Sequence, residues 1–330
     1  MATTVQRVLG RSGIEVSPVG FGCWAIGGPF VGGDGKPAGW GEVDDAESIA
    51  AINRALELGV TFFDTADVYG VGHSETVLGQ ALAGRRDRVV IATKFGNVFD
   101  ASTRAITGSD ISPGYVRGAC EASLRRLNTD HIDLYQLHVG DVALSEVDGL
   151  LATLEELVAA GKIRAYGWST DDPTRAAAFA KGSHCVAVQH ELNVLGDTAA
   201  MLDVCTEYGL TSINRGPLAM GLLSGKYTAT STLATDDVRG DDAPGWMRYF
   251  ADGRPSPHWL ARLAAIREVL TGDGRTLAQG ALGWILARHD ATLPIPGCRT
   301  VAQTEENAGT LARGPLGQDA VTEIARLLAD

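Results

Sequence analysis

Four residues of the sequence have side chains that together could carry out acid–base chemistry: Asp64, Tyr69, Lys94 and His138. Asp64 ends the apolar run of "FFDTADVYG", and Tyr69 follows five positions later. A buried carboxylate costs several kcal/mol unless it is paired, so Asp64 needs a partner such as Lys94, which follows "VVIAT". A nearby ammonium also lowers the pKa of a tyrosine, which is about 10 in the free side chain. The sequence therefore predicts that Lys94 pairs with Asp64 and lowers the pKa of Tyr69, while His138 orients the oxygen that Tyr69 protonates.

Taken singly, these residues have structural explanations, because a histidine at a strand end is more often structural and a lysine there is usually just solvated. A shared site needs a scaffold that brings the ends of separate segments together. Short apolar runs alternate with helical patterns, and the predicted strands are residues 19–22, 60–64, 88–94, 131–138, 164–169, 185–192, 210–214 and 291–296. Periodic segments predict helices between them, including residues 45–59, 115–127, 146–161 and 276–289.

Near-continuous apolar strands that alternate with helices are typical of an α/β protein with a (β/α)8 TIM barrel, whose active site lies at the C-terminal ends of the strands. A doubly wound open sheet is the alternative. The segment "VQRVLGRSGIEVSPVG" predicts a β-hairpin that caps the N-terminal mouth. Residues 26–43 and 228–257 predict long functional loops on the C-terminal face. No linker or repeat divides the chain, so we expect residues 1–330 to form a single domain.

The charge balance argues against two classes of partner. Lys plus Arg number 28 against 40 Asp plus Glu, giving a formal net charge of −12, which disfavours nucleic acid and anionic membrane surfaces. No apolar run approaches the roughly 18 residues that span a bilayer, and the start "MATTVQRVLGRSG" lacks the pattern of a secretion signal. We therefore expect a soluble, cytoplasmic protein.

Neither a metal site nor a common nucleotide-binding loop is indicated. The five cysteines are scattered without a CxxC pair, and the seven histidines include no HExxH. The patterns GxGxxG and GxxxxGK(S/T) are absent, although "GLLSGKY" is superficially similar to a phosphate loop. If the chain binds a nucleotide, it uses another scaffold.

Six segments, in their order along the chain, resemble the aldo-keto reductase superfamily over nearly the full length: "FFDTADVYGVGHSE", "VVIATKFG", "DLYQLH", "VAVQHELN", "PLAMGLLSGKY" and "IPGCRTVAQTEEN". The resemblance implies an NADP(H)-dependent (β/α)8 barrel without a Rossmann domain. It also implies hydride transfer from the nicotinamide to a carbonyl carbon, with Tyr69 as general acid and His138 as orienter or polariser of the substrate.

The resemblance further implies a set of cofactor contacts. Gln189 would bind the nicotinamide carboxamide with Ser169 beside it, "GPLAMGLLSGK" would surround the pyrophosphate, and Arg299 would meet the 2′-phosphate unless it is simply a surface arginine. The implied residues are Ser169, Thr170, Gln189, Arg215, Pro217, Leu218, Gly221, Leu223, Ser224, Lys226, Gly297, Arg299, Gln303, Glu306 and Asn307. Trp24 and Phe95 are expected to wall the substrate pocket, and such apolar walls suggest a small aldehyde or an aromatic carbonyl. Aromatic residues between positions 246 and 259 could close a lid.

Three positions differ from the commonest pattern of the superfamily. Thr170 stands where Asn is frequent and Leu192 where Tyr is frequent, and Arg215 replaces an aromatic residue expected against the nicotinamide. A guanidinium can stack on a ring but carries a permanent charge. The hypothesis is that Arg215 packs on the nicotinamide and favours its reduced, neutral form; the alternative is that it turns outward toward phosphate.

The leading function is therefore an NADPH-dependent carbonyl reductase that acts on a small-molecule substrate. A narrow pathway reductase, acting on a sugar nucleotide or pyridoxal, is a second reading, although four aspartates at positions 236, 237, 241 and 242 disfavour nucleotides. A cofactor-binding regulatory subunit, similar to the potassium-channel β-subunits, is a third, and a non-redox barrel such as a sugar isomerase is a fourth. The sequence leaves the substrate, the oligomeric state and the direction of flux open.

Overall fold

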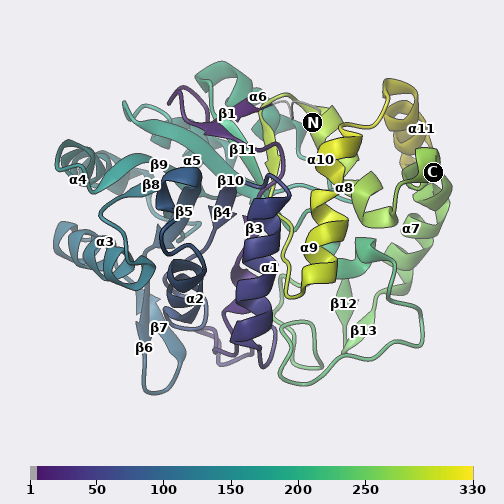
Figure 1. The fold of residues 1–330 in the computed structure, drawn as a ribbon, viewed down its shortest axis with the longest axis horizontal. Coiled ribbons are helices and arrows are strands. Elements are labelled where there is room, and N and C mark those ends of the chain that lie inside the picture. Colours follow the sequence, from purple (N-terminus) through teal and green to yellow (C-terminus); the bar gives the residue numbers. More distant parts are fainter. Residues whose placement is uncertain (1–5, 330) are drawn as a thin grey trace.

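A computed structural model describes residues 6–329, which fold around a closed ring of parallel strands (Figure 1). The ring follows the order of the strands in the chain: β3 (Phe21–Gly22), β4 (Phe62–Asp64), β5 (Val90–Phe95), β8 (Ile132–Leu137), β9 (Ile163–Ser169), β10 (Cys185–Glu191), β11 (Thr211–Arg215) and β14 (Thr292–Pro294). Gly20 donates to Pro294 O at 2.9 Å and Gly22 to Pro296 O at 2.9 Å, and these bonds join the first strand to the last. The predicted (β/α)8 barrel is confirmed, and the open-sheet alternative is wrong.

Helices surround the barrel. In chain order they are α1 (Asp45–Glu57), α2 (His73–Ala81), α3 (Pro113–Leu127), α4 (Val147–Ala159), α5 (Pro173–Phe179), α6 (Ala199–Tyr208), α7 (Pro257–Leu270), α8 (Leu277–Arg288), α9 (Val301–Ala308), α10 (Thr310–Arg313) and α11 (Gln318–Ala329). The four predicted helices are all present. None of the described helices is long and apolar enough to cross a membrane.

Local sequence signals explain where these helices begin. Asp44 accepts hydrogen bonds from the backbone N–H groups of Ala46 and Glu47 at the start of α1, and Thr276 forms a capping box with Gln279 at the start of α8. α1 and α9 pack side by side on one flank of the barrel (Figure 1). This places the start of α9 near the C-terminal ends of β3 and β14.

The N-terminal hairpin closes the opposite end of the barrel. β1 (Arg7–Val8) and β2 (Glu15–Val16) pair in antiparallel register, and Leu9 and Val16 are buried against barrel-interior residues such as Phe62. Gly10 has a φ of +50°, and a Cβ there would lie 2.2 Å from Val186 O, so only glycine fits this turn. The predicted cap is confirmed, although Val5, where the predicted hairpin begins, lies outside the described residues.

Shorter strands occupy the loops on the C-terminal face. β6 (Asn97–Asp100) and β7 (Ala105–Ser109) form a hairpin after β5, and β12 (Phe250–Ala251) and β13 (Arg254–Pro255) form another within the loop of residues 228–257. That loop meets the other long loop, residues 26–43, because Val238 N donates to Gly39 O at 2.8 Å and Trp40 forms a β-bridge with Asp237. We call this contact, made by residues 39–40 and 237–239, the clasp.

Candidate active site

The C-terminal end of the barrel interior holds a buried ion pair. Lys94 Nζ lies 2.5 Å from Asp64 Oδ1 and also donates to Thr65 O at 2.9 Å; both charged side chains are almost fully buried. Strand alternation explains why Lys94 faces inward, since Val90 and Ala92 join the interior cluster. Burial alone would lower the pKa of Lys94, but Asp64 and Tyr69 raise it above its usual value, so the lysine is charged.

Tyr69 lies next to this pair, with its hydroxyl 3.3 Å from Lys94 Nζ and the ammonium 4.9 Å from its ring centre. Burial raises the pKa of Tyr69, Lys94 lowers it and Asp64 raises it, and the net result is a pKa above 10.0. The predicted effect of Lys94, which lowers the pKa of Tyr69, is therefore present, but the net pKa of Tyr69 in this structure is still above its usual value. The reason is that the loss of hydration, assisted by the negative charge of Asp64, outweighs the ammonium.

His138 follows β8 and presents its ring edge-on to Tyr69, with the ring centres 5.7 Å apart. Burial, Lys94 and Arg215 hold the pKa of His138 well below 6.5, so the imidazole is neutral at physiological pH. Its Nδ1 is buried without a hydrogen-bond partner among residues 6–329. A neutral imidazole beside a phenol can donate one hydrogen bond to an oxygen that lies between them.

The second oxygen of Asp64 accepts hydrogen bonds from two amides of the barrel interior. Gln136 Nε2 lies 3.0 Å and Gln189 Nε2 lies 2.8 Å from Asp64 Oδ2, and Gln189 Nε2 is also 3.3 Å from Gln136 Oε1. The family resemblance implies a contact between Gln189 and the cofactor carboxamide, whereas Gln136 is not among the predicted site residues. The sequence does hold a signal for Gln136, because this residue lies two positions before His138 and therefore on the same face of the strand.

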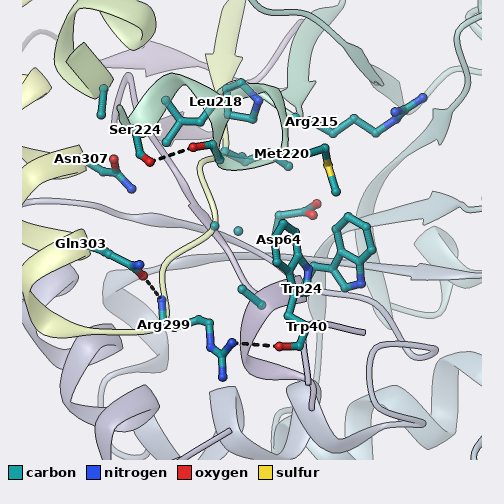
Figure 2. A pocket seen from close by; sticks show the side chains of 18 of the residues that line it. Trp24, Trp40, Asp64, Arg215, Leu218, Met220, Ser224, Arg299, Gln303 and Asn307 are labelled. Carbon is teal, nitrogen blue, oxygen red and sulfur yellow. Dashed lines mark hydrogen bonds between the residues drawn. The ribbon is translucent and has the colours of Figure 1, made fainter. Parts of the chain in front are cut away.

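A long cleft extends from Asp64 and Tyr69 to the start of α9 (Figure 2). It brings together most of the residues expected to contact a cofactor: Gln189, Arg215, Pro217, Leu218, Gly221, Ser224, Lys226, Gly297, Arg299, Gln303, Glu306 and Asn307. Ser169 and Thr170 instead line an adjoining outer cavity that also contains His138. Leu223 does not line the cleft, because its side chain is fully buried in a hydrophobic cluster with α7 and α8.

The two expected pocket walls lie in different places. Trp24 lines both the cleft and the outer cavity, and its ring stacks on Tyr69 with centres 6.0 Å apart. Phe95 lines neither, which corrects the expectation. It follows Lys94 directly, so strand alternation turns it to the outer face, where it stacks on Tyr135 with ring centres 4.4 Å apart.

Arg215 lies at the opening of both hollows. Its guanidinium forms an ion pair with Asp171, and Figure 2 shows the side chain extended away from Asp64. Met220 lies in a short 3₁₀ segment and has a positive φ of 55°. It lines the cleft closer to Trp24 than Arg215 does (Figure 2). The hypothesis that Arg215 packs on the nicotinamide stays a prediction. Leu192, another of the three positions that depart from the commonest pattern, is fully buried in the same cluster as Leu223.

The clasp contributes residues that the sequence analysis missed. Arg239 pairs with Asp237, Nη2 to Oδ2 at 2.6 Å, and lies over the Trp40 ring at 4.5 Å. Arg299 donates to Trp40 O at 2.8 Å (Figure 2) and also to Glu42 O. Trp40 and Arg239 both line the cleft. No local pattern marks these residues, because their roles arise only where two distant loops meet.

The cleft suits a ligand that carries phosphate groups. The cations among its described lining residues are Arg215, Lys226, Arg239 and Arg299, and within residues 6–329 Lys226 has no carboxylate partner. Gly221 and Gly297 leave backbone exposed along it, as close approach of a ligand requires. Trp40 Nε1 is buried and has no hydrogen-bond partner among the described residues. No cluster of His, Cys, Asp and Glu in this part of the chain could hold a metal ion.

Comparison with known proteins agrees with the expected resemblance. A family model described as the aldo/keto reductase family matches residues 18–329. Aldo-keto reductase YhdN of Bacillus subtilis (strain 168) is 33% identical over 304 residues, which cover 89% of this chain and 85% of that protein. Aldo-keto reductase yakc of Schizosaccharomyces pombe, whose name specifies NADP(+), is 31% identical over 307 residues and covers 90% of this chain and 84% of its own.

Solved structures are also similar. The holo form of aldo-keto reductase AKR11C1 from Bacillus halodurans superposes with a TM-score of 0.79 at 30% identity, covering 98% of this chain and 96% of its own. An aldo-keto reductase from Klebsiella pneumoniae in complex with NADPH gives a TM-score of 0.69 at 26% identity, covering 98% and 95%.

Proposed function

Because the chain belongs to the aldo/keto reductase family, we propose that it uses NADPH to reduce the carbonyl group of an aldehyde or ketone to an alcohol. The observation that carries this proposal is the buried chain of contacts from Asp64 through Lys94 to Tyr69, with a neutral His138 beside the phenol. The Klebsiella relative solved with NADPH and the yeast relative named for NADP(+) support the choice of cofactor.

The long cleft is the proposed binding site of NADPH. Gln189 would hold the carboxamide of the nicotinamide, residues 216–226 would surround the pyrophosphate, and Arg299, Gln303 and Asn307 would hold the adenosine half. When bound, NADPH supplies the hydride that reaches the carbonyl carbon. Ser169 and Thr170 lie beside the proposed nicotinamide end, in the outer cavity.

Tyr69 donates the proton that the carbonyl oxygen requires. Its raised pKa keeps the phenol protonated at neutral pH, so the acid form is ready before the reaction begins. Lys94, 3.3 Å from the hydroxyl, stabilises the phenolate that remains after the proton has left. His138 donates a hydrogen bond to the same oxygen and stabilises the negative charge that develops there.

The outer cavity is the proposed site of the substrate. Trp24, Val68, Trp246 and Met247 provide apolar walls around Tyr69. The cations among its described lining residues each pair with a carboxylate: Arg175 with Asp172, Arg215 with Asp171 and Arg248 with Glu191. An uncharged carbonyl compound therefore fits this cavity better than an anionic one.

The experiment that tests the proposed function compares wild type with Tyr69→Phe. We expect wild type to oxidise NADPH with at least one member of a panel of uncharged aldehydes and ketones. The variant should lose about 100-fold to 10,000-fold of kcat, because it has no proton to donate. NADPH affinity, followed by quenching of tryptophan fluorescence, should remain close to that of wild type. Full activity in Tyr69→Phe would contradict the assigned role, and tight NADPH binding without any turnover in wild type would favour a regulatory subunit.

A further inference from the structure

Gln136 is an uncharged polar residue in the barrel interior, in the same part of it as the charged side chains of Asp64 and Lys94. Its side chain is fully buried, and it faces the interior together with Leu134 of the same strand. The alternate residues Tyr135 and Leu137 face the surrounding helices. Burying an amide costs free energy unless its donors and acceptors are used, so an interior glutamine needs a specific partner.

That partner is the Asp64 carboxylate. Among the described residues, the amide N–H of Gln136 donates to Asp64 Oδ2 at 3.0 Å, while its carbonyl accepts from Gln189 Nε2 at 3.3 Å. The strand register makes this reach possible. Gln136 lies beside Lys94 of β5 on one side and beside Gly167 of β9 on the other, where the missing side chain leaves room. The amide thus shares one layer of the barrel with the catalytic lysine.

We propose that Gln136 is a positioning residue that fixes the Asp64 carboxylate and so controls how strongly Lys94 acts on Tyr69, an inference that rests on the proposed function. The two oxygens of Asp64 accept hydrogen bonds from different partners in this arrangement. Oδ1 accepts from Lys94 Nζ at 2.5 Å, and Oδ2 accepts from the amides. Loss of the Gln136 N–H would leave more of the carboxylate's negative potential to act on its surroundings, including the phenol.

The charged and titratable groups that face Tyr69 define the direction of this effect. Lys94 and Arg215 favour the phenolate, Asp64 disfavours it, and the neutral His138 lies edge-on to the ring. The thiol of Cys23 adjoins Asp64 and is neutral, because burial and Asp64 raise its pKa. Asp64 is the anion that disfavours the phenolate. Loss of the hydrogen bond from the Gln136 amide to Asp64 must therefore raise the pKa of Tyr69 further.

Gln189 makes the role of Gln136 more important when the cleft is filled. In the structure Gln189 Nε2 is shared between Asp64 Oδ2 and Gln136 Oε1. Gln189 is also the proposed contact of the cofactor carboxamide. A hydrogen bond from Gln189 to that carboxamide would draw its amide away from Asp64. Gln136 would then be the remaining amide donor to that oxygen.

The test uses Gln136→Met, which conserves side-chain length but cannot donate. We expect the pKa of Tyr69 to rise by about half a unit to one unit. Two measurements read this shift. The first is the alkaline limb of the pH profile of kcat, which should move to higher pH because loss of the Tyr69 proton ends carbonyl reduction. The second is the ultraviolet titration of phenolate in the cofactor-free protein, taken as the difference between each protein and its Tyr69→Phe counterpart.

Thr93→Val is the matched control. Thr93 neighbours Lys94 on β5 and is equally buried, but its hydroxyl donates to Glu75 Oε1 at 2.5 Å on the outer face of the sheet. This substitution should lower the stability of the fold without shifting the alkaline limb of the kcat profile or the phenolate titration of Tyr69. Gln136→Leu provides a second apolar replacement that matches Leu134, in case the methionine variant does not fold.

The result that overturns the inference is an alkaline limb and a phenolate titration that both stay at their wild-type positions in the folded Gln136 variants. A failure of the proposed function looks different, since wild type would then reduce no carbonyl compound or Tyr69→Phe would keep full activity. The phenolate titration needs no turnover, so it tests Gln136 in either case.

Discussion

Burial keeps two histidines near the strand ends, His138 and His190, in their neutral form. His190 is fully buried on β10, with Nε2 2.7 Å from Ser212 Oγ and Nδ1 3.2 Å from the backbone oxygen of Glu191. Burial lowers the pKa of His190 from 6.5 to about 4, although the contact with Glu191 O raises it slightly. The ring therefore has a structural role that depends on remaining uncharged.

This shift predicts an acid-sensitive contribution to stability. The unfolded chain binds a proton near pH 6.5 and the folded one only near 4, so stability is lost as pH falls through that interval. The full loss is about 3 kcal/mol. Urea unfolding of wild type and His190→Gln at several pH values measures it, and the variant should lose less stability on acidification. The exposed His258→Gln is the control, and identical pH dependence in wild type and His190→Gln would contradict the assignment.

Single residues also show what the sequence could and could not predict. Asp64, Lys94 and His138 were found because each ends an apolar run, and a parallel barrel gathers such ends. The prediction for Phe95 was wrong because the residue directly after Lys94 in a strand points to the opposite face of the sheet. The effect of Lys94 on the pKa of Tyr69 was predictable, but the net direction of the shift was not, because the cost of burial depends on packing that no local pattern encodes.

At the scale of elements, strands and helices were predictable because their periodicity is local, whereas the meeting of loops was not. The clasp depends on Arg239, which is buried beneath Trp40 and donates to Met220 O at 3.0 Å and Tyr227 Oη at 2.6 Å. These partners come from segments far apart in the chain. Arg239 therefore joins the loop of residues 228–257, the loop of residues 26–43 and the 3₁₀ segment Ala219–Ser224.

We predict that Arg239→Ala accelerates the dissociation of NADPH by about tenfold or more, because a desolvated cation–π contact and its hydrogen bonds hold the loops over the cleft. Rapid-mixing displacement, followed by the fluorescence of bound NADPH, measures this rate. Arg54→Ala removes an arginine that bonds Glu57 and Glu305 on the exposed surface and should leave the rate unchanged. Equal rates in wild type and Arg239→Ala would show that the clasp does not retain the cofactor.

At the scale of the whole molecule, one end of the barrel carries the proposed active site and the N-terminal hairpin closes the other. We predict that Gly10→Ala destabilises the fold by about 3 kcal/mol or more without changing kcat, since the new Cβ would meet Val186 O at 2.2 Å at the end remote from Tyr69. Gly13→Ala, with a φ of +74° and open space around it, should cost only about 1 kcal/mol. Denaturant unfolding and steady-state kinetics separate the two effects. Equal losses in both variants would contradict the clash.

The hydrogen bonds from Arg299 to the loop of residues 26–43 limit which changes of sequence that loop can accept. Arg299 donates to the main-chain oxygens of Trp40 and Glu42, and the neighbouring Val238 N donates to the main-chain oxygen of Gly39. Main-chain acceptors are the same whatever the residue. Substitutions in this stretch therefore preserve the attachment, whereas a single insertion or deletion shifts every oxygen out of register. The loop is free to diversify in composition but is constrained in length.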